Sequence, residues 1–186
     1  MNVLITFGGT KEPIDSVRYI GNSSSGKTGL NIANYLITEG AKVTCIKADG
    51  VNDVPEANNI NFFTFENLQT ALLEELHNND YDAIIHAAAV SDYRVSKVSS
   101  DANEAAAVGG KIRSGQRLQI TLEPTPKLIE KIKDVSKNKD ILLVGFKLTE
   151  AANMQETMDA VYKVFNSGAD IVVQNDLSGI TKDKHI

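Results

Sequence analysis

The stretch Gly21–Gly29, which reads GNSSSGKTG, constrains this chain more than any other. It is small and polar, and it leads directly into an apolar helical period that begins at Leu30. A loop of this kind before a helix leaves several backbone N–H groups pointing at one place, where the helix dipole adds positive potential. The stretch therefore predicts a phosphate site. The alternative is an ordinary helix start that is capped by Ser24 or Ser25.

The same stretch also matches the P-loop pattern G-x-x-x-x-G-K-[ST], through Gly21, Gly26, Lys27 and Thr28. That pattern describes a phosphate cradle only where a buried strand runs into its first glycine. Residues 15–20 have little buried-strand character, and the clear strand before them ends well upstream. A P-loop and an unrelated loop that is rich in Gly and Ser both remain open interpretations of these residues.

Size, charge and cysteine content narrow the class of protein. The chain has 186 residues, of which 42% are hydrophobic, and this is ample for one domain with a core. The formal net charge of −5 argues against a general nucleic-acid or membrane-surface binder. No run is long and apolar enough to cross a membrane, and the start lacks a signal-peptide pattern. The single cysteine, Cys45, lies in an apolar run and is expected to be a buried, inert thiol, so we expect a cytoplasmic protein.

Alternating apolar runs predict an α/β fold, Rossmann-like, with an open, mostly parallel sheet and helices on both faces. The predicted strands are 3–7, 42–47, 60–65, 82–88, 141–146 and 171–173. The predicted helices are 27–39, 68–76, one that opens at Thr125-Pro126, and 154–165 with Met158, Val161 and Phe165 facing inward. Residues 11–20 are expected to form a connector.

The alternation is interrupted after the fourth predicted strand. Residues 96–110 are rich in Ser, Ala and Gly and show no period, which predicts a flexible loop or lid. Leu118–Leu122 alternates as a strand, so a small excursion from the main sheet is expected at about 89–122. We see no second domain. Because no closing element precedes Ile186, a final strand and helix are expected to lie outside these residues.

The loops that follow the predicted strands should meet at one edge of the sheet. Ligands of open parallel sheets bind at that edge. The loops concerned are Gly8–Thr10, Ala88–Asp92, Phe146–Lys147 and Asn175–Asp176, and the helix start at Ser24–Gly29 joins them. The sequence therefore predicts a site of nucleotide size, although such edges host many different reactions.

Six stretches, in order and over nearly the whole chain, resemble phosphopantothenoylcysteine synthetase (phosphopantothenate–cysteine ligase) of coenzyme A biosynthesis, in its stand-alone form. They are GGTKEPID (8–15), VRYIGNSSSG (17–26), AAAVSDYR (87–94), KIRS (111–114), VGFKL (144–148) and VQND (173–176). The family motif at the second stretch is Asn-x-Ser-Ser-Gly, which does not need Gly21 or Thr28. The resemblance therefore favours the loop that is not a P-loop.

The resemblance implies a ligation in two steps. A nucleotide, CTP or ATP, would activate the carboxylate of 4′-phosphopantothenate as an acyl-nucleotide with loss of pyrophosphate, and L-cysteine would then form the amide. It implies Mg²⁺ to screen the triphosphate, and no flavin, because the fused flavin-dependent decarboxylase is missing. It also implies a homodimer, whose interface would come from the 89–122 excursion and would carry residues to the partner's site.

The resemblance also assigns roles, residue by residue. The nucleotide would be bound by Gly8, Ser24, Gly26, Gly29, Asp92, Lys111, Phe146, Lys163 and Asn175. Phosphopantothenate or its acyl intermediate would be bound by Asn22, Ala88, Ala89 and Asp92. Asn22, Lys111 and Arg18 would serve catalysis, with Lys111 neutralising the charge that develops. A second lysine, expected one turn after Lys163, is absent, so CTP and ATP remain open. His86, in mid-strand, is expected to belong to the core, and no metal site built from side chains is predicted.

Two other classes remain as alternatives to the ligase. One is a P-loop NTPase or kinase that uses Gly21–Thr28, which would also need an acidic Mg²⁺ ligand at the end of a neighbouring strand. The other is a non-catalytic nucleotide-binding Rossmann module, although the chain lacks G-x-G-x-x-G after its first strand.

Overall fold

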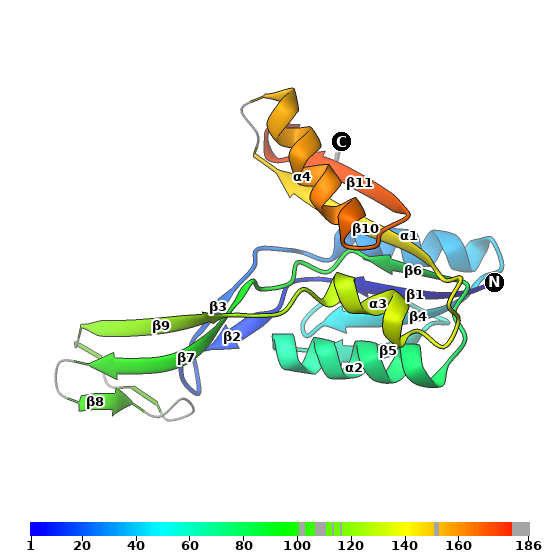
Figure 1. Cartoon of the computed structure of the whole chain (residues 1–186). Helices are drawn as coiled ribbons and strands as arrows, with labels where there is room; N and C mark the ends of the chain where they lie inside the picture. Colours follow the sequence, from blue (N-terminus) through cyan, green and yellow to red (C-terminus); the bar gives the residue numbers. More distant parts are fainter. Residues whose placement is uncertain (101–102, 107–110, 113, 116, 151–152, 180–186) are drawn as a thin grey trace.

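The centre of the molecule is a sheet of six parallel strands, seen in a computed structural model that describes residues 1–100, 103–106, 111–112, 114–115, 117–150 and 153–179 (Figure 1). In spatial order the strands are β11 (Ile171–Asp176), β10 (Leu142–Thr149), β6 (Ala83–His86), β1 (Asn2–Phe7), β4 (Lys42–Ala48) and β5 (Asn58–Phe62). When these six strands are numbered from 1 to 6 in chain order, their spatial order is 6-5-4-1-2-3, which is that of a Rossmann fold and confirms the predicted class.

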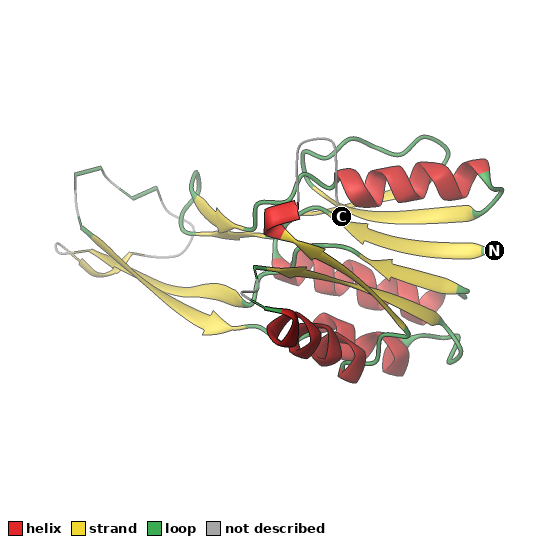
Figure 2. Cartoon of the chain, turned by 90° about the horizontal axis from the view of Figure 1, so that it is seen from above, coloured by secondary structure: helices red, strands yellow, loops and turns green. Residues whose placement is uncertain are grey.

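Helices cover both faces of the sheet. Helix α1 (Lys27–Thr38) follows β1 and packs on one face, over Phe7, Cys45 and their neighbours. Helix α2 (Phe65–Asn78), the short pair η1 (Leu128–Lys131) and α3 (Ile132–Val135), and α4 (Met154–Asn166) belong to the other face. Figure 2 shows the strands between these two layers. The handedness of the crossovers requires this division, because the chain moves along the sheet in opposite directions from β1 and from β6.

The α1 face is uncovered over β10 and β11 within the described part of the chain. Register places Leu142, Val144, Phe146 and Leu148 of β10 on the same face as Ile5 and Ile85. Leu142 is 41% exposed and Leu148 is 50% exposed. An open, apolar strip therefore runs along the sheet beside α1.

Residues 11–20, predicted as a connector, contain ordered structure. Strand β2 (Lys11–Pro13) pairs antiparallel with β3 (Tyr19–Gly21) to form a hairpin. All three residues of β3 are exposed, so Gly21 does not follow a buried parallel strand. The P-loop interpretation of Gly21–Thr28 is therefore wrong. The sequence pattern is present, but the buried parallel strand that a P-loop needs directly before its first glycine is not.

The predicted aperiodic loop at 96–110 is also wrong over the residues that the structure describes. Strand β7 (Tyr93–Ser100) pairs antiparallel with β8 (Asn103–Ala106) and with β9 (Leu118–Pro124). This three-stranded sheet projects from the main sheet (Figure 1). Small and polar residues form strands here because antiparallel pairing supplies their backbone hydrogen bonds. The rest of the predicted lid, 101–102 and 107–110, lies outside the described residues.

Several predicted boundaries shift for local reasons. Strand β5 ends at Phe62 rather than Phe65, because Thr64 and Asn67 form a capping box that starts α2. Strand β6 ends at His86 rather than Ala88. The helix expected at Pro126 begins only at Leu128, as the single turn η1. The expected closing elements lie outside the described residues.

The inward face predicted for α4 is also wrong. Met158 is 38% exposed and Phe165 is 40% exposed, while Val161 is only partly buried. The contact with the sheet is made instead by Val164, which lies over Gly145 of β10. A Cβ on Gly145 would lie 2.8 Å from Val164 Cγ1, so the glycine allows this close packing.

Two further expectations concern burial. Cys45 is fully buried in β4, as predicted, and burial raises the pKa of its thiol to about 12. Among the described residues, no helix has the length and apolar character needed to span a membrane.

Candidate functional site

The predicted edge is present, and its centre lies just beyond the carboxyl ends of the neighbouring strands β1 and β6. The chain leaves these neighbouring strands in opposite directions, which is where open α/β sheets bind ligands. Gly9 forms an isolated parallel bridge with Ala89 just beyond the two strands. The Asn22 side-chain amide lies on the same spot and donates to the Ala89 carbonyl at 2.9 Å. A Cβ on Gly9 would lie 2.4 Å from the Asn22 carbonyl oxygen, so only glycine fits.

A second set of hydrogen bonds holds the loop after β6 in place. The Ser91 amide donates to Thr10 Oγ1 at 2.8 Å, and the Thr125 hydroxyl donates to the Ser91 carbonyl at 2.6 Å. Asp92, the next residue, has a side chain that is 63% exposed and that pairs with Lys127 Nζ at 2.5 Å. Ala88, Ala89 and Asp92, predicted to bind phosphopantothenate, lie along one short loop, and among the described residues Ala89 is the one of the three that a hydrogen bond joins to Asn22.

Helix α1 begins at the same edge with its N–H groups open. Its N-cap is Gly26, with φ of +72°, a residue that has no side chain with which to cap the helix. Ser25 Oγ accepts the Lys27 N–H at 3.4 Å, a long hydrogen bond, so the alternative of a serine cap is met in part, by Ser25. Ser24 and Ser25 are exposed. Uncapped N–H groups with neighbouring hydroxyls are donors that an anion could accept.

Two glycines predicted at the nucleotide have structural duties as well. A Cβ on Gly29 would lie 2.2 Å from Phe7 Cβ, so Gly29 lets α1 pack against β1. Gly8 has φ of +89°, and its Cβ would lie 2.4 Å from Ala48 Cβ. A hollow of about 350 Å³ beside the start of α1 is lined by residues that include Ser25 and Lys27.

Phe146 and Asn175 lie on the α1 side of the sheet, near the carboxyl ends of β10 and β11. Register pairs Leu148 with Asn175, and Phe146 is two residues before Leu148 on the same face. Both residues are partly buried. The start of α1 and this pair therefore lie on the same side of the sheet, while the Ala88-Ala89 loop lies at the edge, with Ala88 packed toward the opposite face.

Arg18 and Lys111 form a separate basic group. They line one hollow of about 730 Å³ together with Val17, Ile112 and Ser114. Between Arg18 and Asn22 lies β3, whose extended residues separate the two Cα atoms by roughly 13 Å. Within one chain, the basic group is thus set apart from the Asn22 cluster.

Lys163 is the predicted site residue that the topology does not bring to this edge. It lies in the last turn of α4, and α4 runs back from the carboxyl end of β10 to the amino end of β11. The turn that carries Lys163 is therefore on the side of the sheet where strands begin. The helix predicted at 154–165 already ends near Lys163, so the parallel topology could have placed the residue on this side from the sequence.

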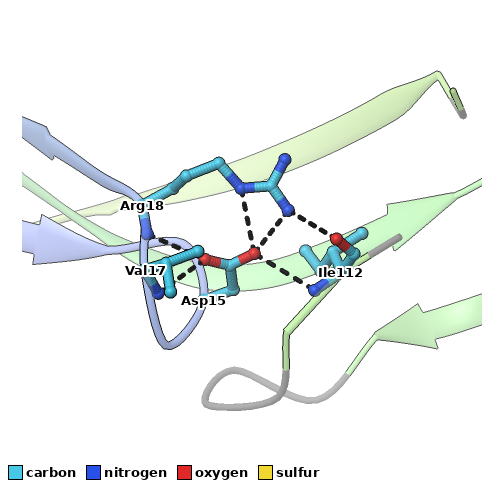
Figure 3. A network of polar contacts seen from close by, with 4 residues as sticks. All are labelled: Asp15, Val17, Arg18 and Ile112. Carbon is cyan, nitrogen blue, oxygen red and sulfur yellow. Dashed lines mark hydrogen bonds and ion pairs between the residues drawn. The ribbon is translucent and has the colours of Figure 1, made fainter. Parts of the chain in front are cut away.

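Two interactions near the site were missed from the sequence. His86 is buried beneath the loop, with Nδ1 2.8 Å from Thr6 Oγ1, and burial lowers the pKa of its ring to about 4. Asp15 binds Arg18 and the Ile112 backbone (Figure 3). The Asp-x-x-Arg spacing was a usable signal for the pair, but nothing in the sequence joins it to Ile112.

The side chains of the described residues do not assemble a metal centre. No group of three or more His, Cys, Asp or Glu side chains is placed to hold an ion among them. Mg²⁺ bound to a nucleotide normally takes only one or two carboxylates and completes its shell with phosphates and water.

Comparison with known proteins identifies the family. The profile of the DNA/pantothenate metabolism flavoprotein C-terminal domain matches residues 1–185. The chain belongs to this family. The coenzyme A biosynthesis bifunctional protein CoaBC of Thermococcus kodakarensis is 39% identical over 186 residues, which cover 98% of this chain and 43% of that protein. The chain therefore spans less than half the length of the curated relatives it matches.

Solved structures agree with this assignment. The DNA/pantothenate metabolism flavoprotein of Streptococcus pneumoniae superposes with a TM-score of 0.84 at 28% identity, covering 100% of this chain and 86% of that one. A more distant protein, solved in complex with phosphopantothenate-cysteine, superposes with a TM-score of 0.72 over 95% of this chain and 73% of its own. At 19% identity the second match shows a shared fold alone.

Proposed function

We propose that this domain is a phosphopantothenate–cysteine ligase, which joins 4′-phosphopantothenate to L-cysteine at the expense of a nucleoside triphosphate. The observation that carries the proposal is the contact between two family motifs. Asn22, from the Gly- and Ser-rich loop, donates to Ala89, from the loop after β6, at the point where Rossmann folds bind ligands. Membership of the family, together with relatives that act in coenzyme A biosynthesis, supplies the chemistry.

The reaction proceeds in two steps. A carboxylate oxygen of phosphopantothenate attacks the α-phosphorus of the nucleotide, and pyrophosphate leaves with the electron pair of the broken P–O bond. The cysteine nitrogen then attacks the acyl carbon, loses a proton and expels the nucleoside monophosphate. Both steps build negative charge on oxygen, which preorganised cations and N–H donors stabilise.

The nucleotide lies across the α1 face of the sheet. Its phosphates take the open N–H groups at the start of α1, with Gly8, Ser24, Gly26 and Gly29 around them. Its base packs on Phe146 and bonds to Asn175. Support comes from the position of these residues on the α1 side of the sheet, which is uncovered over β10 and β11 in the described part of the chain. Lys163 is not part of this proposal, since α4 carries it toward the other side of the sheet.

The acid lies beside the nucleotide, over the loop after β6. Asn22 orients the acyl group, Ala88 and Ala89 offer backbone contacts, and Asp92 lies at the rim where both substrates meet. Arg18 and Lys111 neutralise charge during activation. Because the Cα atoms of Arg18 and Asn22 lie roughly 13 Å apart within one chain, and Lys111 lines the same hollow as Arg18, we propose that a second copy brings its basic group to the site in a homodimer.

We propose that the reaction uses Mg²⁺ but no flavin. Mg²⁺, when bound to the triphosphate, screens its charge and favours loss of pyrophosphate. Asp92 is the side chain at the edge that would approach it. The family is named after a flavoprotein, but this chain matches its C-terminal domain, and the proposed ligation includes no redox step. We therefore propose that this domain works without flavin.

The test is a turnover assay with the purified chain, Mg²⁺ and each of CTP and ATP. Release of pyrophosphate that requires phosphopantothenate, and a product with the mass of phosphopantothenoylcysteine that requires cysteine as well, would support the ligase. The nucleotide with the higher kcat/KM decides the choice between CTP and ATP. Nucleotide binding without any turnover would instead support a non-catalytic module and contradict the proposal.

A further inference from the structure

Asp15 is a buried acid that collects donors from two distant parts of the chain. Its side chain is fully buried. Oδ1 accepts the backbone N–H groups of Val17 at 2.9 Å and of Arg18 at 2.8 Å. Oδ2 accepts Arg18 Nε at 2.9 Å, Arg18 Nη2, and the backbone N–H of Ile112 at 3.1 Å (Figure 3). The carboxylate thus ties its own turn to a residue 97 positions away.

Arg18 completes a grip on both sides of the Ile112 peptide backbone. Its Nη2 donates to the Ile112 carbonyl at 2.9 Å, while Asp15 accepts the Ile112 N–H. The side-chain pair thereby replaces the two hydrogen bonds that a neighbouring strand would have made. The Ile112 side chain is also buried, with only 9% of the residue exposed. Charge-assisted bonds of this kind, made away from water, hold their partners firmly.

Lys111, the residue before Ile112, is exposed and lines the same hollow as Arg18. The other terminal nitrogen of the guanidinium points away from Asp15 in Figure 3, and 42% of the Arg18 side chain is exposed. Arg18 therefore serves the grip through Nε and Nη2 and also lines the hollow that Lys111 lines.

The charge of Asp15 suits this task at every physiological pH. The bonds from the Arg18 side chain hold the pKa of Asp15 far below its usual range, although burial acts in the opposite direction. An ionised carboxylate is acceptor-only, and an acceptor-only group is what the five donors around Asp15 require.

We propose that Asp15 is a positioning residue for Lys111: with Arg18 it clamps the Ile112 backbone and so fixes where the Lys111 cation stands. Asp15 lies behind both cations and, in this account, touches neither substrate. This inference rests on the proposed function, because it takes Lys111 to act in the activation of the acid. A side chain that holds a catalytic group at the required position commonly governs rate without contacting substrate.

The first arm of the test does not depend on activity. Hydrogen exchange of the Ile112 amide is measured in the whole chain, in Asp15→Asn and in Asp170→Asn. The Asp15→Asn side chain would turn an amide N–H toward donors, so exchange at Ile112 should become at least tenfold faster. Asp170 is a matched control, because it also accepts a backbone N–H, from Leu143 at 2.8 Å, and pairs with Lys133. Its substitution should leave exchange at Ile112 within twofold of the wild type.

A second variant covers a failure of Asp15→Asn to fold. Arg18→Lys keeps a cation beside Asp15 but lacks the fork that reaches the Ile112 carbonyl, so it too should speed exchange at Ile112. If Ile112 exchanges at the wild-type rate in both folded variants, or in Arg18→Lys alone when Asp15→Asn does not fold, the clamp is refuted.

The second arm is a double-mutant cycle on the rate of pyrophosphate release. Asp15→Asn should slow release by about tenfold to a hundredfold, yet should add less than twofold to the defect of Lys111→Gln, because it acts through Lys111. If the two defects multiply, Asp15 is merely structural and the inference is wrong. If the wild type itself releases no pyrophosphate, the proposed function fails, while the exchange arm still decides whether the clamp exists.

Discussion

Single hydrogen bonds decide what the residues at the edge of the sheet do. Asn22 is the clearest case, because its amide N–H meets the Ala89 carbonyl at 2.9 Å and thereby joins two loops. An amide at this position combines a donor toward Ala89 with an acceptor toward a ligand. The residue thus serves both the shape of the edge and its proposed chemistry.

Asn22→Asp should separate the two half-reactions. It replaces the donor with a carboxylate that faces the Ala89 carbonyl and an anionic intermediate, so amide formation should fall about a hundredfold while pyrophosphate release falls only a few fold. Quenched-flow with labelled phosphopantothenate should show acyl-nucleotide accumulating. Asn34→Asp is the matched control, since Asn34 bonds only to the Leu30 carbonyl on α1 and its change should leave both rates intact. Equal loss of both steps in Asn22→Asp would contradict the role.

His86 should make stability depend on pH. Burial lowers the pKa of its ring to about 4, whereas the unfolded chain has about 6.5. The unfolded state therefore binds a proton first, and the stability that comes from neutral His86 is lost as pH falls from about 6.5 toward 4. Between pH 7 and pH 4.5 the wild type should lose about 2 kcal/mol more than His86→Asn in urea unfolding.

The control for this measurement is His77→Gln, which leaves His86 in place and should keep the wild-type dependence on pH. Equal losses of unfolding free energy in the wild type and in His86→Asn would show that the ring is not held neutral in the folded chain.

At the scale of elements, the start of α1 is shaped by packing as much as by any ligand. Gly29 lies in the first turn of α1, and the place of its Cβ is taken by Phe7 of β1. This contact sets how close the open N–H groups come to the end of β1. The geometry of the proposed phosphate site therefore depends on a helix–strand contact below it.

Gly29→Ala should destabilise the fold by about 1–3 kcal/mol, because its Cβ would lie 2.2 Å from Phe7 Cβ and α1 would have to move. It should also weaken nucleotide binding, since the N–H groups move with the helix. Denaturant unfolding and nucleotide titration measure the two effects. Asn34→Ala, at an exposed position further along the same helix, should change neither by much. A Gly29→Ala protein as stable as the wild type would contradict the packing.

The elements also show what the sequence could and could not reveal. Strong apolar runs such as Val3–Phe7 and Lys42–Lys47 predicted their strands to within a residue, because burial in a parallel sheet demands such runs. Strands β7 and β8 were missed, because their stability comes from pairing with distant residues rather than from an apolar pattern. Strand β3 was missed for the same reason. Its exposed, antiparallel position is what excludes a P-loop at Gly21–Thr28.

The site was predictable to the same degree. Its place at the strand ends follows from parallel topology, and the structure puts Gly8, Asn22, Ala89, Phe146 and Asn175 there. The separation of Arg18 from Asn22 and the link from Asp15 to Ile112 depend on tertiary geometry, which spacing along the chain does not encode. The position of Lys163 at the opposite edge of the sheet, by contrast, follows from the helix predicted at 154–165 and could have been inferred from the sequence.

At the scale of the whole molecule, apolar side chains are exposed on the hairpin and on the projecting sheet. They include Val17 at 63%, Tyr19 at 51%, Tyr93 at 55% and Leu122 at 43%. These residues belong to the same region as the basic group that the proposed site requires from a second copy. Exposed apolar side chains gathered in one region are typical of protein–protein interfaces.

The chain should therefore be a symmetric homodimer at micromolar concentration in sedimentation analysis. Leu122→Glu, which places a charge on β9, should shift it toward monomer and reduce activity together. Tyr35→Glu, an equally polar change at an exposed position of α1, should leave the dimer intact. A wild-type monomer that is fully active would contradict a site completed across the interface.

An oxygen label can show whether the acid is activated by attack on the α-phosphorus of the nucleotide. Phosphopantothenate carrying ¹⁸O in its carboxylate is turned over with cysteine and the preferred nucleotide, and the products are weighed by mass spectrometry. The account predicts one ¹⁸O in the nucleoside monophosphate and none in pyrophosphate, because the acyl oxygen leaves on the α-phosphorus. Label in orthophosphate together with a nucleoside diphosphate, or a monophosphate without label, would contradict it.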